Sequence, residues 1–247
     1  MVNLWDNPDL LVRTGSHLYG CNVPASDVDT RGFALPPAEY LLGRKHWEQY
    51  ESKEPDTVIW SFQKFFNLLE RFSPNTVEII FAPKKHIIEI TPIGERIIDN
   101  KHLFVSKRLI KPIQGFAFSE WKKAIIYDET RKLGKQRIDH TNKYGYSVKN
   151  AYHAIRLLGE CIELMETGNL TFPRPDADFL RKVRHGEVPI EVVEAKYNEL
   201  DAKVLSTYGG SNLPDDVNKD SLDNLYYGII EDKLKEFFND RILSATA

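Results

Sequence analysis

The sequence Gly15-Ser16-His17-Leu18-Tyr19-Gly20, followed by Ser26-Asp27-Val28-Asp29-Thr30-Arg31-Gly32, decides the fold. An apolar run at residues 10–14 precedes it and predicts a short strand. Residues 27–35 predict a second strand, and residues 57–60 a third. Two strands joined by a short Gly-Ser turn and a polar loop therefore form the centre of the predicted fold.

The second strand carries a pair of aspartates at its start. Side chains alternate along a strand, so Asp27 and Asp29 are expected to project from the same face. A divalent cation relieves the repulsion between two such carboxylates, and their oxygen atoms suit magnesium. A lone Asp-x-Asp is also typical of a turn or a solvated strand edge, so the metal-binding interpretation of the pair depends on the residues around it.

That context is the Gly15-Ser16 turn upstream. Glycine lets a phosphate approach the backbone closely. The following amides and the Ser16 hydroxyl are suitable donors to phosphate oxygens, and a helix that begins here would favour an anion. His17 lies beside this turn, and we interpret it as a packing or hydrogen-bonding residue.

These motifs resemble the signature of the DNA polymerase β nucleotidyltransferase superfamily, and more closely that of the RlaP-type predicted nucleotidyltransferases. That family carries Gly-Ser-x-Ala-Tyr-Gly and then Ser-Asp-x-Asp-x-Arg-Gly; here Leu18 replaces the alanine. Downstream, the sequence Lys149-Asn150-Ala151-Tyr152-His153-Ala154-Ile155-Arg156 resembles the family's Lys-x-Ala-Tyr-His-x-x-Arg helix. The resemblance implies two catalytic magnesium ions, with manganese as the alternative, held by Asp27, Asp29 and a third carboxylate.

The third carboxylate is expected on a later strand. Asp56, which opens the predicted strand at residues 57–60, is the best match, although a residue after Pro55 could simply start the strand. Glu78 is the fallback, with a buried hydrogen-bonding role as its other interpretation. Arg31 shares a strand face with the aspartates and would either bind phosphate or pair with a carboxylate.

Basic side chains are expected to complete the nucleotide site. The predicted nucleotide-binding residues are Gly15, Ser16, Lys107, Lys149, His153 and Arg156. Lys149, His153 and Arg156 recur at i, i+4 and i+7 and so share one helix face. That face could also be solvated, with Arg156 paired to Glu160. Arg108 is a weaker candidate beside Lys107.

Residues 122–149 contain eight basic and three acidic residues, with tyrosines interleaved. Such a segment is suited to following an RNA backbone, with aromatic rings available for stacking. It is equally typical of a solvated loop.

The composition is that of a globular protein. The chain has 247 residues, 42% of them hydrophobic, and a net charge of −3, which does not indicate a general attraction to nucleic acid. No apolar run reaches the roughly 18 residues of a membrane span, and the two cysteines form no zinc-type pair. We expect a cytoplasmic protein with no membrane partner.

The predicted fold class is α+β. A polymerase-β-like nucleotidyltransferase domain at residues 1–100, a small mixed sheet flanked by helices, would precede a mainly helical domain at residues 101–247 that completes the cleft. Helices are predicted at residues 62–72, 147–166, 187–205 and 221–243, whereas residues 75–81 are ambiguous.

The expected activity is transfer of a nucleoside monophosphate from a nucleoside triphosphate to an acceptor hydroxyl, with an RNA 3′ end favoured. The alternatives are a non-catalytic nucleotide- or RNA-binding module, and a toxin- or defence-type nucleotidyltransferase that modifies a protein or tRNA. They differ from the first hypothesis in turnover and in acceptor, respectively.

Overall fold

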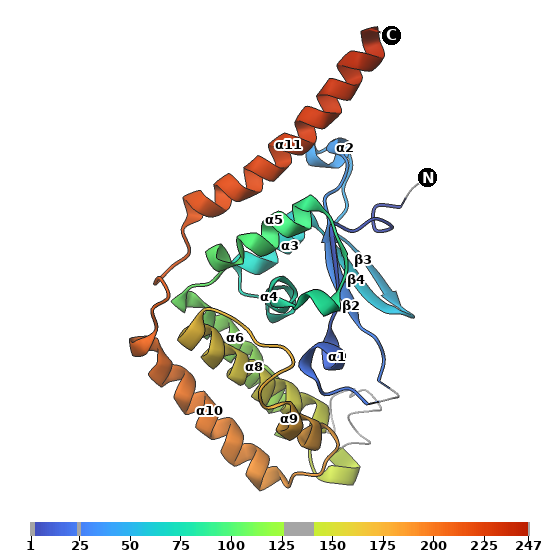
Figure 1. Cartoon of the computed structure of the whole chain (residues 1–247). Helices are drawn as coiled ribbons and strands as arrows, with labels where there is room; N and C mark the ends of the chain where they lie inside the picture. Colours follow the sequence, from blue (N-terminus) through green and yellow to red (C-terminus); the bar gives the residue numbers. More distant parts are fainter. Residues whose placement is uncertain (1–2, 24–25, 126–140, 247) are drawn as a thin grey trace.

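The computed structural model describes residues 3–23, 26–125 and 141–246, and contains a five-stranded mixed sheet that lies to one side of most of the helices (Figure 1). The strands lie in the order β3-β4-β2-β1-β5. Their bounds are β1 Leu10–Arg13, β2 Thr30–Ala34, β3 Gln49–Lys53, β4 Asp56–Ser61 and β5 Ile87–Ile90. Together with the helices described below, this confirms the predicted α+β class.

The pairing of β2 with its two neighbours, β1 and β4, brings together residues that are far apart in the sequence. β2 runs antiparallel to β1 and parallel to β4, with Thr30 opposite Thr57. β2 begins three residues later than predicted, because the last pair of the β1–β2 ladder is Arg13 with Thr30 and the chain then turns into a helix. The register places Asp29 and Asp56, which occupy adjacent positions one residue earlier, at the same end of the sheet.

The helices of the N-terminal half lie mainly on one side of this sheet (Figure 1). They are α1 Gly15–Tyr19, α2 Ala38–Leu41, α3 Phe62–Glu70, α4 Pro74–Phe81 and α5 Pro92–Asp99. The Ser61 side chain caps α3 by accepting a hydrogen bond from the Lys64 amide, and the ring of Phe65 stacks on Phe33 of the sheet. The ambiguous residues 75–81 are helical, which suits a proline at the first helical position.

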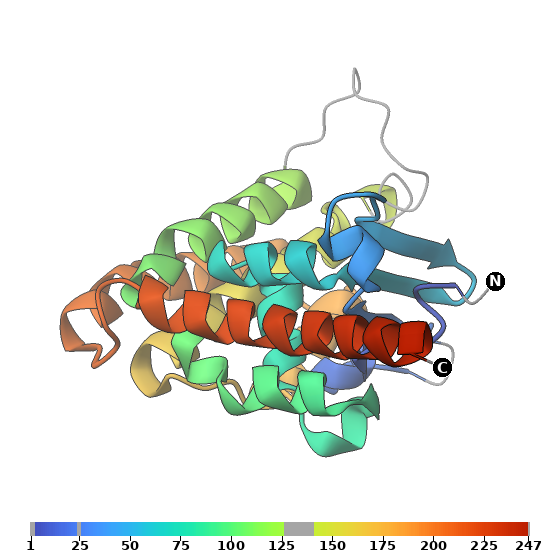
Figure 2. The ribbon, with the colours of Figure 1, turned by 90° about the horizontal axis from the view of Figure 1, so that it is seen from above.

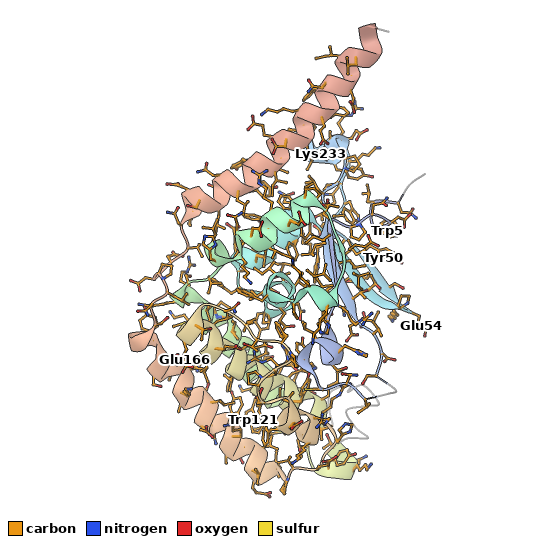
Figure 3. The ribbon with its side chains drawn as sticks, in the orientation of Figure 1. Trp5, Tyr50, Glu54, Trp121, Glu166 and Lys233 are labelled. Atoms are coloured by element: carbon orange, nitrogen blue, oxygen red, sulfur yellow. The ribbon has the colours of Figure 1, made fainter. Side chains whose placement is uncertain are left out.

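The second half of the chain is mainly helical, as predicted. Its helices are α6 Ile110–Ile125, α8 Val148–Thr167, α9 Ala177–Arg184, α10 Ile190–Gly210 and α11 Lys219–Thr246. The described chain also contains three short 3-10 turns, at Lys84–His86, Lys101–Phe104 and Lys107–Leu109. Trp121 of α6 stacks on Tyr197 of α10 with ring centroids 4.5 Å apart, and Figure 3 labels Trp121 in this layer.

The last helix returns to the sheet half. Tyr226 of α11 stacks on Phe62 with ring centroids 5.3 Å apart, and Arg96 of α5 pairs with Asp232. Figure 2, the view from above, shows α11 lying across the other elements. In Figure 1 its C-terminal part extends beyond them. One hydrophobic cluster contains buried residues of both halves. The division at residue 100 stays a prediction, and α11 belongs by its contacts to the sheet half.

None of the described helices combines the length and the apolar composition needed to cross a membrane.

Candidate active site

A cavity of about 500 Å³ lies between the sheet end and the helical half, in the size range of small-ligand sites. The sheet half contributes Thr14, Gly15, Ser16, Asp27, Asp29, Arg31, Asp56 and Glu78. The helical half contributes Phe116, Glu120, Lys149, Tyr152, His153, Arg156 and Arg184. The cavity thus contains both the motif residues and helix residues far along the chain.

Two of the aspartates form a close pair at the sheet end. Burial and a hydrogen bond with the Asp56 carboxyl raise the pKa of Asp29. Burial by itself would raise the pKa of Asp56, but its ion pair with Arg31, 3.0 Å between Nη2 and Oδ1, lowers that pKa. Arg31 therefore pairs with a carboxylate, as one of its two interpretations predicts. The pair gathers negative charge that a bound cation would relieve.

Asp27 lies apart from this pair, although it lines the same cavity. It is exposed, precedes β2 and is two residues before Asp29. Across residues 3–23, 26–125 and 141–246, no three Asp, Glu, His or Cys side chains converge as a complete metal site. The donor set still fits magnesium, or manganese, because these ions keep several waters and take only a few carboxylates from the protein. Asp29 and Asp56 would be the inner ligands, and Asp27 would join them.

Gly15 lies close against the Asp29 carboxylate. Its φ is +65°, and a Cβ built there would lie 2.0 Å from Asp29 Oδ2. Any other residue would displace the carboxylate or distort the turn. The next residue, Ser16, is buried in α1 and lines the cavity. His17 Nε2 lies 3.4 Å from the Ser26 carbonyl oxygen, which matches its predicted hydrogen-bonding role.

Lys149 and His153 line the cavity from α8. Lys149 forms no ion pair with any residue in the described part of the chain, and its charge lowers the pKa of both Asp29 and Asp56. Burial, and then the charges of Arg156 and Lys149, hold the pKa of His153 well below its usual range. Lys149 is thus a cation available to a ligand, whereas His153 is a neutral donor or acceptor.

Arg156 lines the cavity, but its charge is already balanced. Its Nη1 donates to the Glu78 carboxylate and to Glu160, at 2.8 Å from Oε1, and the Tyr19 hydroxyl donates to Glu78. All four side chains are buried. The structure therefore places Arg156 in this buried network, and its nucleotide-binding role stays a prediction. Glu78 belongs to the network too, as its hydrogen-bonding interpretation predicts.

The structure does not bring Lys107 to the site. Lys107 Nζ pairs with Asp215 Oδ1 at 3.1 Å, and Arg108 Nη1 with Asp216 Oδ2 at 2.9 Å. Neither basic residue lines the cavity. We remove Lys107 from the nucleotide-binding set, because it pairs with the segment that leads into α11.

Two cavity residues that the sequence did not single out are Tyr152 and Arg184. Tyr152 lies within the Lys-x-Ala-Tyr-His-x-x-Arg helix, so its spacing offered a signal that was not used. Arg184 ends α9, and no motif marked it. Of the predicted RNA-contacting segment 122–149, residues 126–140 lie outside the described residues.

Comparison with known proteins places this arrangement in a family. The family model RlaP, described as "RNA repair pathway DNA polymerase beta family", matches residues 10–196. The chain belongs to this family, and the match suggests a polymerase-β-like nucleotidyltransferase.

A relative in Enterobacteria phage T4, an uncharacterized 38.9 kDa protein, is 28% identical over 108 residues. The aligned part covers 38% of this chain and 32% of the phage protein, so the chain matches about a third of that relative's length. No solved structure gives a significant match.

Proposed function

We propose that the protein is a metal-dependent nucleotidyltransferase that moves a nucleoside monophosphate from a nucleoside triphosphate to an acceptor hydroxyl. The observation that carries the proposal is the adjacency of Asp29 and Asp56 at the ends of two parallel strands, beside Gly15. Asp27 and Lys149, which forms no ion pair within the described part of the chain, line the same cavity. Membership of the polymerase-β-like family supports the same chemistry.

Each side chain has a role that follows from its place. Asp29 and Asp56 would hold two Mg²⁺ or Mn²⁺ ions, with Asp27 as the third ligand. When bound, such ions offset the charge of the triphosphate and lower the pKa of the attacking hydroxyl. The Ser16 hydroxyl would donate to a phosphate oxygen, and Lys149 would add positive charge beside the carboxylates. Arg31 would keep the Asp56 carboxylate ionised and oriented through their ion pair.

RNA is the acceptor that the surface next to the site favours. Val12 of β1 pairs with Ile87 of β5, so Arg13 and His86 are neighbours at the end of β1 that leads into α1. Lys84 and Lys85 precede His86 and are exposed, as Arg13 is, and these three cations form no ion pair with the described residues. A polyanionic strand that contacts this surface would reach the cavity through the Gly15-Ser16 turn.

The test is incubation with each labelled nucleoside triphosphate, magnesium and total RNA, followed by separate assay of RNA and protein. Wild type should label RNA, and the variant Asp27→Ala with Asp29→Ala should not. Asp220→Ala, an exposed carboxylate at the start of α11, is the matched control and should behave as wild type.

Other outcomes would point to the alternative functions. Equal labelling by wild type and the double variant would overturn the proposal. Label in protein, or in one tRNA with arrest of growth on expression, would favour the toxin or defence type. Nucleotide binding without transfer to any acceptor would favour the binding module.

A further inference from the structure

The cavity wall formed by α8 and α9 contains a buried hydroxyl with no partner. Tyr152 is 3% exposed and lines the cavity, and its hydroxyl makes no hydrogen bond within the described residues. Buried polar groups in folded proteins are normally hydrogen-bonded. Burial raises the pKa of Tyr152 far beyond its usual range, so the phenol stays a donor. A donor of this kind is suited to a ligand that supplies the missing acceptor.

A cation without an acidic partner among the described residues lies near the Tyr152 ring. The Arg184 guanidinium carbon is 6.0 Å from the centroid of the Tyr152 ring, and Arg184 also lines the cavity. Its Nη1 donates to the Cys21 carbonyl at 3.3 Å, and no described carboxylate forms an ion pair with it. Arg156, in contrast, is paired with two buried carboxylates. The positive charge of Arg184 is therefore available to an anion.

The two available cations of the cavity lie near different groups, although both lower the pKa of His153. Lys149 on α8 lowers the pKa of Asp29 and Asp56, whereas Arg184, at the end of α9, lies near the Tyr152 ring and donates to the Cys21 carbonyl. His153, whose ring centroid is 4.9 Å from that of Tyr152, is neutral and adds no competing charge. The cavity therefore has a carboxylate end with Lys149 and a second, cationic end with Tyr152 and Arg184.

We propose that Tyr152 and Arg184 bind the terminal phosphate of the nucleoside triphosphate, which leaves as part of pyrophosphate. The proposal rests on the proposed function, which assigns the carboxylate end to the metals and the reacting phosphate. A phosphate group presents several acceptor oxygens, so it satisfies the phenol and the guanidinium at once. The phosphate of an RNA acceptor has the same chemistry, and the experiment separates the two sources.

The experiment is calorimetric titration of the full chain, in magnesium and without acceptor. The ligands are the nucleoside triphosphate that wild type binds most tightly and the corresponding diphosphate. Arg184→Gln should weaken triphosphate binding by about tenfold to a hundredfold, as expected for a hydrogen bond to a charged group. Tyr152→Phe should weaken it about two- to tenfold. Diphosphate binding should change little in either variant.

Two controls separate a binding role from a structural one. Tyr152→Phe removes only a hydroxyl without a partner, so its unfolding temperature should equal or exceed that of wild type. Lys182→Gln removes an exposed cation from the same helix as Arg184, and its affinities should match wild type.

Equal losses of triphosphate and diphosphate affinity in the variants would overturn the terminal-phosphate assignment. Unchanged nucleotide affinities with a raised KM for RNA would overturn it as well and assign the pair to the acceptor. Failure of the proposed function looks different, because wild type itself would then transfer no nucleotide. If wild type transfers normally and both variants bind both nucleotides as wild type does, the inference alone fails.

Discussion

Two pairs of carboxylates lie at the cavity or directly behind its wall, and they differ in how their charge is balanced. At the sheet end, Asp29 and Asp56 are partly accessible, and Arg31 is the cation paired with Asp56. At the helical wall, where α8 contacts α4 of the sheet half, Glu78 of α4 and Glu160 of α8 are buried and both accept hydrogen bonds from Arg156. The first pair lies where a ligand can reach it, whereas the second is enclosed by protein.

This difference separates the carboxylates that would bind a ligand from those that stabilise the fold. A buried charge must be paired within the protein, and Glu78 and Glu160 are the partners of the Arg156 charge, while the Arg156 guanidinium carbon lies 4.1 Å from the centroid of the Tyr19 ring. Tyr19 ends α1, so the network holds the helix that starts at Gly15 against α8. The helical wall therefore fixes the position of the turn, and the sheet wall keeps charge available for metals and phosphate.

The largest expected effect is on activity at the sheet wall. Asp29→Asn retains the shape of the side chain but removes the charge that would hold the metals, a contribution of several kcal/mol to the transition state. Nucleotide transfer should fall by about a thousandfold. The unfolding temperature should stay the same or rise, because the amide removes repulsion with Asp56. Full activity with a lowered unfolding temperature would reverse the functional assignment of this wall.

The next effect is on stability at the helical wall. Arg156→Met leaves two glutamates buried without their cation, so the free energy of unfolding should fall by about 3–5 kcal/mol, measured by denaturant titration. The matched control is Lys203→Met, which breaks the exposed ion pair with Glu166 of α8 and should change stability little. A similar small change in both variants would show that the buried network does not support the fold.

The sequence predicted the parts of the fold that rest on local patterns. The apolar repeat of α8 and the aromatic spacing of α3 appear as helices near the expected bounds. β3 and β5 were not predicted, because each is an edge strand of four or five residues that depends on a partner elsewhere in the chain. The polar sequence of β3 shows no apolar alternation, so only its pairing with β4 makes it a strand.

The same distinction applies to the site. Asp27, Asp29 and Gly15 belong to one short motif, and the i, i+4 spacing alone indicated the contact between Arg156 and Glu160. The contacts of Arg156 with Glu78 and of Arg184 with the ring of Tyr152 join distant segments, and no pattern within the sequence specifies them. Arg184, whose charge is available to a ligand, can be distinguished from Arg156, whose charge is balanced by carboxylates, only when the partners of each are known.

A smaller effect tests the geometry of the turn. Gly15→Ala would place a methyl group against Asp29, whereas Gly43→Ala has the same type of positive φ and no neighbour within 4 Å. Both variants should lose about 1–2 kcal/mol of stability from the left-handed backbone conformation. Only Gly15→Ala should also lose activity, measured as nucleotide transfer. Equal activity in both variants would show that the close approach to Asp29 has no catalytic role.

The smallest effect, counted per pH unit, is the pH dependence that the helical wall imposes on stability. Burial raises the pKa of Glu160 to about 8, against the pull of Arg156 and with the added repulsion of Glu78. The folded protein then holds a proton that the unfolded chain releases near its ordinary value of 4.5, so stability should fall as pH rises from about 4.5 to 8. The slope would be at most about 1.4 kcal/mol per pH unit.

Glu160→Gln should flatten the curve of unfolding free energy against pH, whereas Glu166→Gln, on the exposed face of the same helix, should preserve it. An unchanged slope in Glu160→Gln would mean that Glu78 and Glu160 both stay ionised in the folded protein. Their negative charge would then be balanced by Arg156 and by the hydrogen bond from the Tyr19 hydroxyl alone.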